Sequence, residues 1–467
     1  MRTNSVPPGP RPEADPDDRG RGAVLASVMR PINHVVERLI PSALVFAIAL
    51  TFVVAALALA LTDAGPVAVV ESWGVGLAGL LSFMTQMALI LLLGHILANT
   101  RPVRALLTRA ARVPRTAVQA YVFVFLVAAA ASLITWGLGL VVGGLLAREV
   151  AAQGRERGLR LHFPLLVAAG FAGFVVWHMG YSASGPLAAA TPDSFVTEQI
   201  GRPLPISETI FAPWNLAAIG ATVVLVAAAI ILIAPRGRDR VVELEVDARE
   251  RGVAVEDDVV TPADRVDASR VPTLLLGLLL VAYLVIHFAG GGSLTLDIVN
   301  WSFLALILLL VRNPFELIAL TKDAASNVGE ILLQFPLYAG ILGIMSGTGL
   351  IQMFSDFFVS VSTPVTFGLF AFLSAGLVNF FVPSGGGQFA IQAPILLEAA
   401  ERIGVDPAVA IMAVAYGDQW TNMIQPFWAL PLLAIAGLKM RDILGYTTVV
   451  LIVSGAVFAT TMLLVSL

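Results

Sequence analysis

Long runs of apolar residues, separated by short polar segments, follow one another along most of the chain. A helix that crosses a bilayer needs roughly 20 mostly apolar residues. Such runs predict crossing helices over residues 42–62, 77–98, 213–234, 272–289, 298–311, 327–346 and 444–467. Longer or interrupted runs occupy residues 117–147, 163–190, 365–398 and 408–435. The whole pattern predicts nine crossings plus two re-entrant hairpins.

The run over residues 117–147 is too long for one crossing, and T-W-G-L-G stands in its middle at residues 135–139. Arginines flank it on both sides: Arg101, Arg104, Arg109, Arg112 and Arg115 before it, and Arg148, Arg155, Arg157 and Arg160 after it. Because basic loops stay in the cytoplasm, this run enters and leaves on one side, which favours a hairpin. One long tilted helix with a glycine patch is the alternative. The N-terminus is then cytoplasmic as well.

The order of elements repeats in the two halves of the chain: crossing, hairpin, interrupted helix, crossing. We predict a disordered cytoplasmic tail (1–30), a first membrane repeat (31–234), a charged cytoplasmic linker (235–271) and a second membrane repeat (272–467). The hairpins are 117–147 and 365–398, and the broken helices are 163–190 and 408–435. An unmatched crossing at 272–289 inverts the second repeat, and inverted repeats with discontinuous helices indicate a secondary transporter.

Composition supports this class. Hydrophobic residues make up 58% of the 467 residues and charged residues only 13%, against about 25% charged in a soluble domain. The fold class is therefore an all-α polytopic membrane protein. A net charge of −4 argues against nucleic-acid binding, zero Cys excludes disulfides, and five scattered His show no metal-ligand spacing. No P-loop motif occurs, so no ATP is hydrolysed at such a site.

The breaks supply the candidate chemistry. N–H groups at the start of a half-helix suit anions, and C=O groups at the end of one suit cations. We predict a substrate carboxylate site at the hairpin tips and the first broken helix, formed by Ser384, Gly385, Gly386, Gly387, Gln388, Thr135, Gly137, Gly139, Ser182 and Ser184. Two alternatives are that the glycines serve close helix packing and that the serines bond their own backbone.

A coupling cation is predicted beside the second broken helix. Its candidate residues are Asp418, Asn422, Asn379, Gln419 and Gln425. Asp418 lies deep in an apolar run, where acids mark functional sites by default, although it could also be a hydrogen-bond anchor. His178 is either structural or a proton sensor, and we interpret Trp177, Trp420 and Trp428 as packing residues. No Arg or Lys lies near the breaks, which favours a small monoanion.

At these motifs the chain resembles the bacterial short-chain fatty acid uptake transporters, a relative of the ion transporter superfamily. The matching stretches are I-T-W-G-L-G-L-V-V-G (134–143), A-R-E-V-A (147–151), S-G-P-L-A-A-A-T-P (184–192), N-F-F-V-P-S-G-G-G-Q (379–388) and A-Y-G-D-Q-W-T-N-M-I-Q-P-F-W-A-L-P (415–431). The resemblance runs from about residue 29 to the end. It implies uptake of monocarboxylates such as acetoacetate and butyrate across the inner membrane, and a homodimer.

The function we predict is secondary active import of short-chain monocarboxylates by alternating access, coupled to H⁺ or Na⁺. The expected partners are a small organic anion and the bilayer, with no nucleic acid and no cofactor beyond the coupling ion. A cation/proton antiporter is the first alternative, and Asp418 would be its titratable acid. An intramembrane enzyme or a scaffold is the second, for which His178 near Ser182 is the one hint. We predict no enzymatic activity.

Overall fold

The computed structural model describes residues 43–235, 241–244, 259–326, 328–379, 382 and 384–467, and every regular element in them is a helix. The predicted tail and much of the linker lie outside these residues. In the described part, seven segments are long and apolar enough to cross a membrane. The count of nine crossings, the domain limits and the inverted relation of the halves stay predictions.

The helices follow one another without a strand in the described part of the chain. Those before the linker are α2 (Ala43–Leu61), α3 (Pro66–Gly76), α4 (Leu81–Asn99), α5 (Arg101–Ala110), α6 (Ala117–Ile134), α7 (Trp136–Glu156), α8 (Phe163–Ala172), η1 (Gly173–Met179), α9 (Ser184–Ala190), α10 (Phe195–Ile200) and α11 (Pro213–Ile233). Those after it are α12 (Pro262–Asp267), α13 (Val271–Ala289), α14 (Leu296–Leu310), α15 (Pro314–Ala325), α16 (Gly329–Thr348), α17 (Leu350–Val361), α18 (Phe367–Asn379), α19 (Gly385–Ile403), α20 (Pro407–Thr421), η2 (Asn422–Ile424), α21 (Pro426–Ala436) and α22 (Met440–Val465).

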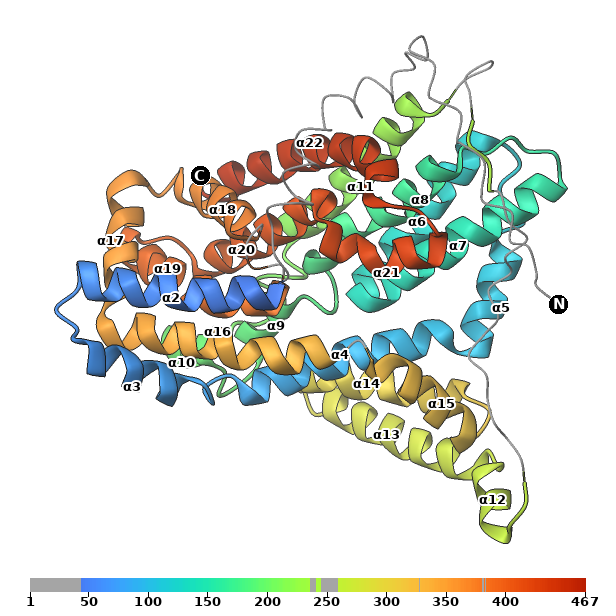
Figure 1. Ribbon diagram of the computed structural model, residues 1–467, viewed down its shortest axis with the longest axis horizontal. Helices are drawn as coiled ribbons and strands as arrows, with labels where there is room; N and C mark the ends of the chain where they lie inside the picture. Colours follow the sequence, from blue (N-terminus) through green and yellow to red (C-terminus); the bar gives the residue numbers. More distant parts are fainter. Residues whose placement is uncertain (1–42, 236–240, 245–258, 327, 380–381, 383) are drawn as a thin grey trace, which may run out of the picture.

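Two groups of helices build the molecule (Figure 1). In the first group, α2 and α3 pack on α16, while α13 packs on α14, which packs on α4. The second group is centred on α20, which contacts α18, α19, α22 and η1, and it includes α6, α7, α8, α11 and α21. Contacts of α4 with α7 and of α16 with α19 join the two groups.

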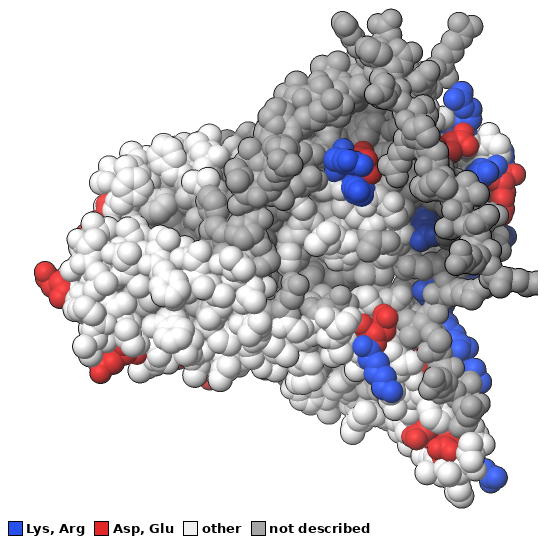
Figure 2. All heavy atoms as spheres, in the orientation of Figure 1, with Lys and Arg blue, Asp and Glu red and all other residues white. Residues whose placement is uncertain are grey.

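The surface has the character of a membrane protein. Large apolar side chains are exposed on α2, α3 and α13, among them Phe52, Val70 and Leu279. On the face shown in Figure 2, Lys and Arg lie towards the end of the molecule that holds α5 and α12, and the opposite half carries few charges. Exposed apolar faces of this extent require a lipid or protein partner.

Helices α6 and α7 form the hairpin-like pair that the first long run predicts. The chain leaves the helical conformation at Thr135, whose φ of −156° and ψ of 139° are extended, so one continuous helix does not form. Arg157, just after α7, donates to the carbonyls of Arg112 and Pro114, just before α6. The two ends of the pair therefore meet at one end of the molecule, and their re-entrant position in a bilayer stays a prediction.

Both interrupted runs are broken in the structure. In the first, α8 continues into a 3₁₀ turn, η1, and the chain is irregular from Gly180 to Ala183 before α9 begins. In the second, α20 passes into η2, and Gln425 is extended before α21 begins at Pro426. Breaks of this kind leave backbone N–H and C=O groups without partners inside a helix.

Several short helices were not expected from the sequence. The basic segment treated as a loop contains α5, and three further helices of 11 or 12 residues, α3, α15 and α17, stand outside the predicted spans or at their edges. These segments are shorter than a crossing requires, so a search for apolar runs of crossing length passes over them.

Close helix packing depends on glycine where α18 crosses α20. A Cβ atom on Gly417 would lie 2.4 Å from the carbonyl oxygen of Phe372 and 2.6 Å from the amide nitrogen of Gly376. Both neighbours are backbone atoms, which cannot move without separating the helices. Small residues at such crossings let membrane helices approach closely.

We therefore expect Gly417→Ala to destabilise the protein by roughly 1–3 kcal/mol, the usual cost of overpacking. The measurement is the apparent unfolding temperature of the purified protein in detergent. Gly220→Ala on α11 is the matched control, because a Cβ there meets nothing within 4 Å. An unchanged unfolding temperature for Gly417→Ala would contradict the tight crossing.

Candidate functional site

A cavity of about 530 Å³ lies between the two groups of helices. Residues from α4, α7, η1, α16, α19 and α21 line it, and most are apolar, for example Met87, Leu91, Phe335 and Leu430. No Lys, Arg, Asp or Glu stands among the described residues that line it. The volume falls in the range of small-molecule sites, about 300–1,000 Å³.

Two helix N-termini reach this cavity. Ser384, Gly385 and Gly386 line it at the start of α19, and Trp136 and Gly137 line it at the start of α7. Ser384 is the N-cap of α19, since its hydroxyl oxygen accepts from the Gly387 amide at 3.2 Å. The amides of a helix's first turn have no partner inside the helix and favour negative charge.

Unpartnered side-chain donors support an anion site at this place. Trp177 and Trp428 line the cavity and are 2% and 8% exposed, and neither indole N–H has a hydrogen-bond partner among the described residues. A buried donor without a partner costs about 1–3 kcal/mol, which a ligand acceptor can recover. The cavity thus combines apolar walls with several donors.

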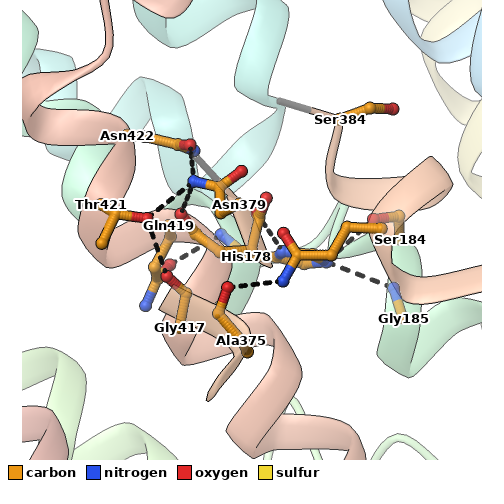
Figure 3. A network of polar contacts seen from close by, with 12 residues as sticks. His178, Ser184, Gly185, Ala375, Asn379, Ser384, Gly417, Gln419, Thr421 and Asn422 are labelled. Atoms are coloured by element: carbon orange, nitrogen blue, oxygen red, sulfur yellow. Dashed lines mark hydrogen bonds and ion pairs between the residues drawn. The ribbon is translucent and has the colours of Figure 1, made fainter. Parts of the chain in front are cut away.

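Behind the cavity wall lies a buried hydrogen-bonded chain of titratable and polar groups (Figure 3). Nδ1 of His178 lies 2.7 Å from Oδ2 of Asp418, and Nε2 lies 2.8 Å from the Ser184 hydroxyl. The side chains of His178 and Asp418 are both fully buried. Ser184 lines the cavity, so the chain leads from Asp418 to the ligand space.

A cluster of amide side chains adjoins Asp418. Nδ2 of Asn379 donates to the Asp418 carbonyl at 2.7 Å and to Oδ1 of Asn422 at 2.6 Å. Gln425 donates to the carbonyl of Asn379, and Gln419 accepts from the His178 amide at 2.9 Å. Oδ1 of Asn379 and Oε1 of Gln425 have no hydrogen-bond partner. The predicted cation residues are thus neighbours, and their role stays a prediction.

The predicted substrate residues divide into two sets. Those that line the cavity are Ser184, Ser384, Gly385, Gly386 and Gly137. Those outside its lining are Thr135, Gly139, Ser182, Gly387 and Gln388.

The second set makes packing or internal contacts. Ser182 accepts from the Trp136 amide at 3.2 Å, and Gln388 donates to the Ala375 carbonyl at 2.8 Å. A Cβ on Gly139 or Gly387 would collide with Ser132 or Tyr338. Thr135 is fully buried, and its hydroxyl has no partner.

Sequence reasoning missed the aromatic part of the site. It interpreted Trp177 and Trp428 as packing residues, but both line the cavity, as Trp136 and Gln334 do. Trp in membrane proteins is enriched at the interfaces, so a Trp next to a break in mid-run was the available signal. Trp420 fits the packing interpretation, because its indole N–H donates to the Leu451 carbonyl at 2.7 Å.

The fold has a solved relative. The chain superimposes on the Alcanivorax borkumensis YdaH transporter with a TM-score of 0.56 and 14% identity, covering 90% of this chain and 98% of that one. At this identity the likeness concerns the fold alone. Together with the seven apolar segments of crossing length, this likeness defines a multi-pass, all-helical membrane fold.

Sequence comparison gives the family. The family model for short chain fatty acid transporters matches residues 24–465, and the chain belongs to that family. A relative from Escherichia coli K12, named as a short-chain fatty acid transporter, is 40% identical and covers 93% of this chain and 98% of its own length. A relative of the same name from Haemophilus influenzae Rd is 36% identical over the same shares of the two chains.

Proposed function

We propose that this protein is a secondary active transporter that imports short-chain monocarboxylates such as butyrate and acetoacetate. The observation that supports this most is the cavity, whose donors stand beside apolar walls. The described lining has no Lys or Arg, and its one imidazole, that of His95, is bonded to Asp323. Helix N-termini and indole N–H groups suit one carboxylate, and the walls suit a short alkyl tail. A di- or tricarboxylate would leave at least one charge uncompensated, which is costly in a low-dielectric site.

Alternating access follows from the cavity's position. It lies between α4 and α16 on one side and α7, α19 and α21 on the other. Relative movement of the two helix groups would expose the cavity to each side of the membrane in turn. H⁺ or Na⁺ would supply the driving force, since the chain has no P-loop.

We place the protein in the bacterial inner membrane, with its N-terminus in the cytoplasm. The arginines of α5 and of the end of α7 support this placement, because they lie at one end of the molecule, where Arg157 donates to the Arg112 carbonyl. Basic segments of short loops stay in the cytoplasm.

Two other functions have a specific observation behind them. The order Asp418–His178–Ser184 is that of the acid, base and nucleophile of serine hydrolases. Labelling of Ser184 by a fluorophosphonate probe would favour that function, and we expect none. A cation/proton antiporter would use Asp418, and proton flux on adding Na⁺ or K⁺ without an organic anion would favour it.

Counterflow in proteoliposomes tests the proposal. Vesicles loaded with unlabelled butyrate are diluted into labelled butyrate, without ion gradients, and protein-free vesicles measure passive permeation. We expect transient, saturable accumulation of label above the protein-free level. Acetoacetate should compete and succinate should not, because the described lining has no Lys or Arg for a second carboxylate and the His95 imidazole is bonded to Asp323. Uptake no faster than in protein-free vesicles would contradict the proposal.

A further inference from the structure

The Asp418–His178–Ser184 chain has a defined direction. The Gly185 amide donates to Nε2 of His178 at 3.3 Å, which favours the tautomer whose ring proton is on Nδ1 and is donated to Asp418. The Ser184 hydroxyl then donates to Nε2 as well, at 2.8 Å. In this state the Ser184 oxygen offers only lone pairs to the cavity and repels a carboxylate.

Few charged groups surround the hydrogen-bonded residues Asp418, His178 and Ser184. The elements packed on η1 are α6, α7, α8, α11, α20 and η2, together with α19 at Gly385 and α21 at Trp428. Their titratable residues are Tyr121, Arg148, Glu149, Arg155, Glu156, Glu398, Glu401, Arg402, Tyr416 and Asp418. Of these, Asp418 contacts the His178 ring. A carboxylate bound in the cavity therefore lies close to one buried acid, Asp418, and to the His178 ring that is bonded to it.

We propose that His178 takes up one proton when a carboxylate binds, and that the Ser184 hydroxyl links the two events. This inference rests on the proposed function and names its coupling ion. The proton enters at Nε2, which then donates to the Ser184 oxygen. The Ser184 hydrogen, released from Nε2, turns to the cavity and donates to the carboxylate. No covalent bond between heavy atoms changes.

Three contacts favour this coupling. Uptake of the proton makes the His178–Asp418 pair one charge unit more positive, which favours a bound anion. Trp177 stacks on His178 with centroids 4.0 Å apart, and an indole face stabilises a cation. The N-terminus of α19 is close, since a Cβ on Gly385 would lie 3.2 Å from Cε1 of His178. Its partial positive charge favours an anion beside the His178–Asp418 pair.

One proton per monoanion makes transport electroneutral. A pH gradient that is alkaline inside would then drive import, and the membrane potential would not change the rate of import. One Na⁺ per monoanion, bound at the amide cluster around Asn379, would also make transport electroneutral, but it would require no proton. The two mechanisms therefore differ in proton uptake on binding, which can be measured without a membrane.

Titration calorimetry of the purified full-length protein with acetoacetate tests the inference. Binding heats are compared in phosphate and in Tris, at about pH 7.5, roughly one unit above the ordinary pKa of His. The two buffers differ strongly in ionisation enthalpy, so the difference in heat counts the protons taken up. We expect close to one proton per bound anion for the wild type and none for His178→Gln.

Matched controls are available for both side chains. His162 is also bonded at both ring nitrogens, to the Val242 amide and the Tyr446 hydroxyl, and burial lowers its pKa. It lies outside the cavity lining, so His162→Gln should keep the proton uptake. Ser184→Ala should weaken binding at least tenfold, and the buried Ser454→Ala, whose hydroxyl bonds its own helix, should not.

The outcomes separate this inference from the proposed function. If the wild type binds acetoacetate with equal heats in the two buffers, proton coupling is wrong. The proposed transport function would not be contradicted by that result. Binding that requires Na⁺ would also overturn proton coupling, in favour of the cluster around Asn379. Absence of both binding and counterflow would overturn the proposed function itself. If His178→Gln does not fold, the wild-type comparison decides alone.

Discussion

The Gly385→Val substitution is expected to reduce butyrate counterflow roughly a hundredfold, since overpacking costs about 1–3 kcal/mol and each 1.4 kcal/mol is tenfold. A Cβ at this position would lie 2.5 and 2.8 Å from two ring atoms of Trp177. Trp177 cannot yield easily, because it is stacked between Phe174 and His178 at centroid distances of 5.7 and 4.0 Å. The added side chain must therefore displace the cavity wall or occupy the carboxylate position.

The control for this prediction is Gly220→Val on α11, where a Cβ meets no atom within 4 Å. Counterflow and the elution profile in size-exclusion chromatography are measured for both variants. Both should elute as the wild type does, because the collision at Gly385 is with side-chain atoms and not with backbone. Counterflow by Gly385→Val within threefold of the wild type would place the substrate elsewhere.

The apolar pattern predicted most long helices and the positions of the breaks. Residues 213–234 and 272–289 correspond closely to α11 and α13, and the predicted broken helices 163–190 and 408–435 are interrupted, at Gly180 and at Gln425. These features are local: run length and Gly or Pro content determine them. The family assignment is confirmed by the match over residues 24–465.

The partner of His178 could not be predicted from spacing. In a continuous helix, residues four apart face each other, which favoured Ser182. The structure pairs His178 with Ser184 instead, because η1 is a 3₁₀ turn and the chain is irregular from Gly180 to Ala183. Ser182 turns to the Trp136 amide. Across a break, helical periodicity no longer predicts which residues face each other.

The sequence pattern also could not predict the contacts between segments that are distant in the chain. The cavity joins Met87, Trp177, Phe335 and Trp428 from four helices or turns. Each residue suits a packed core as well as a binding site, and only the tertiary arrangement places them around one space. Gly137 and Gly139 show the same limit, since the first lines the cavity and the second packs on Ser132.

Ser384→Ala is expected to weaken acetoacetate binding roughly 10- to 100-fold, because a hydrogen bond to a charged group contributes about 1.5–3 kcal/mol. The Ser384 hydroxyl oxygen already accepts from the Gly387 amide at 3.2 Å, so its hydrogen is free to be donated to a ligand in the cavity it lines. Alanine removes both bonds. The lost N-cap destabilises α19 by about 1 kcal/mol, which leaves a folded protein.

Thr116→Ala separates the lost cap from the lost ligand contact. Thr116 caps α6 with the same geometry, accepting from the Gln119 amide at 3.2 Å, and it is exposed and outside the cavity lining. We expect both variants to lose similar stability, but only Ser384→Ala to lose affinity in calorimetry. Ser384→Thr keeps the hydroxyl and should restore most of the binding. If Ser384→Ala and the wild type bind acetoacetate with equal affinity, the α19 N-terminus is not part of the carboxylate site.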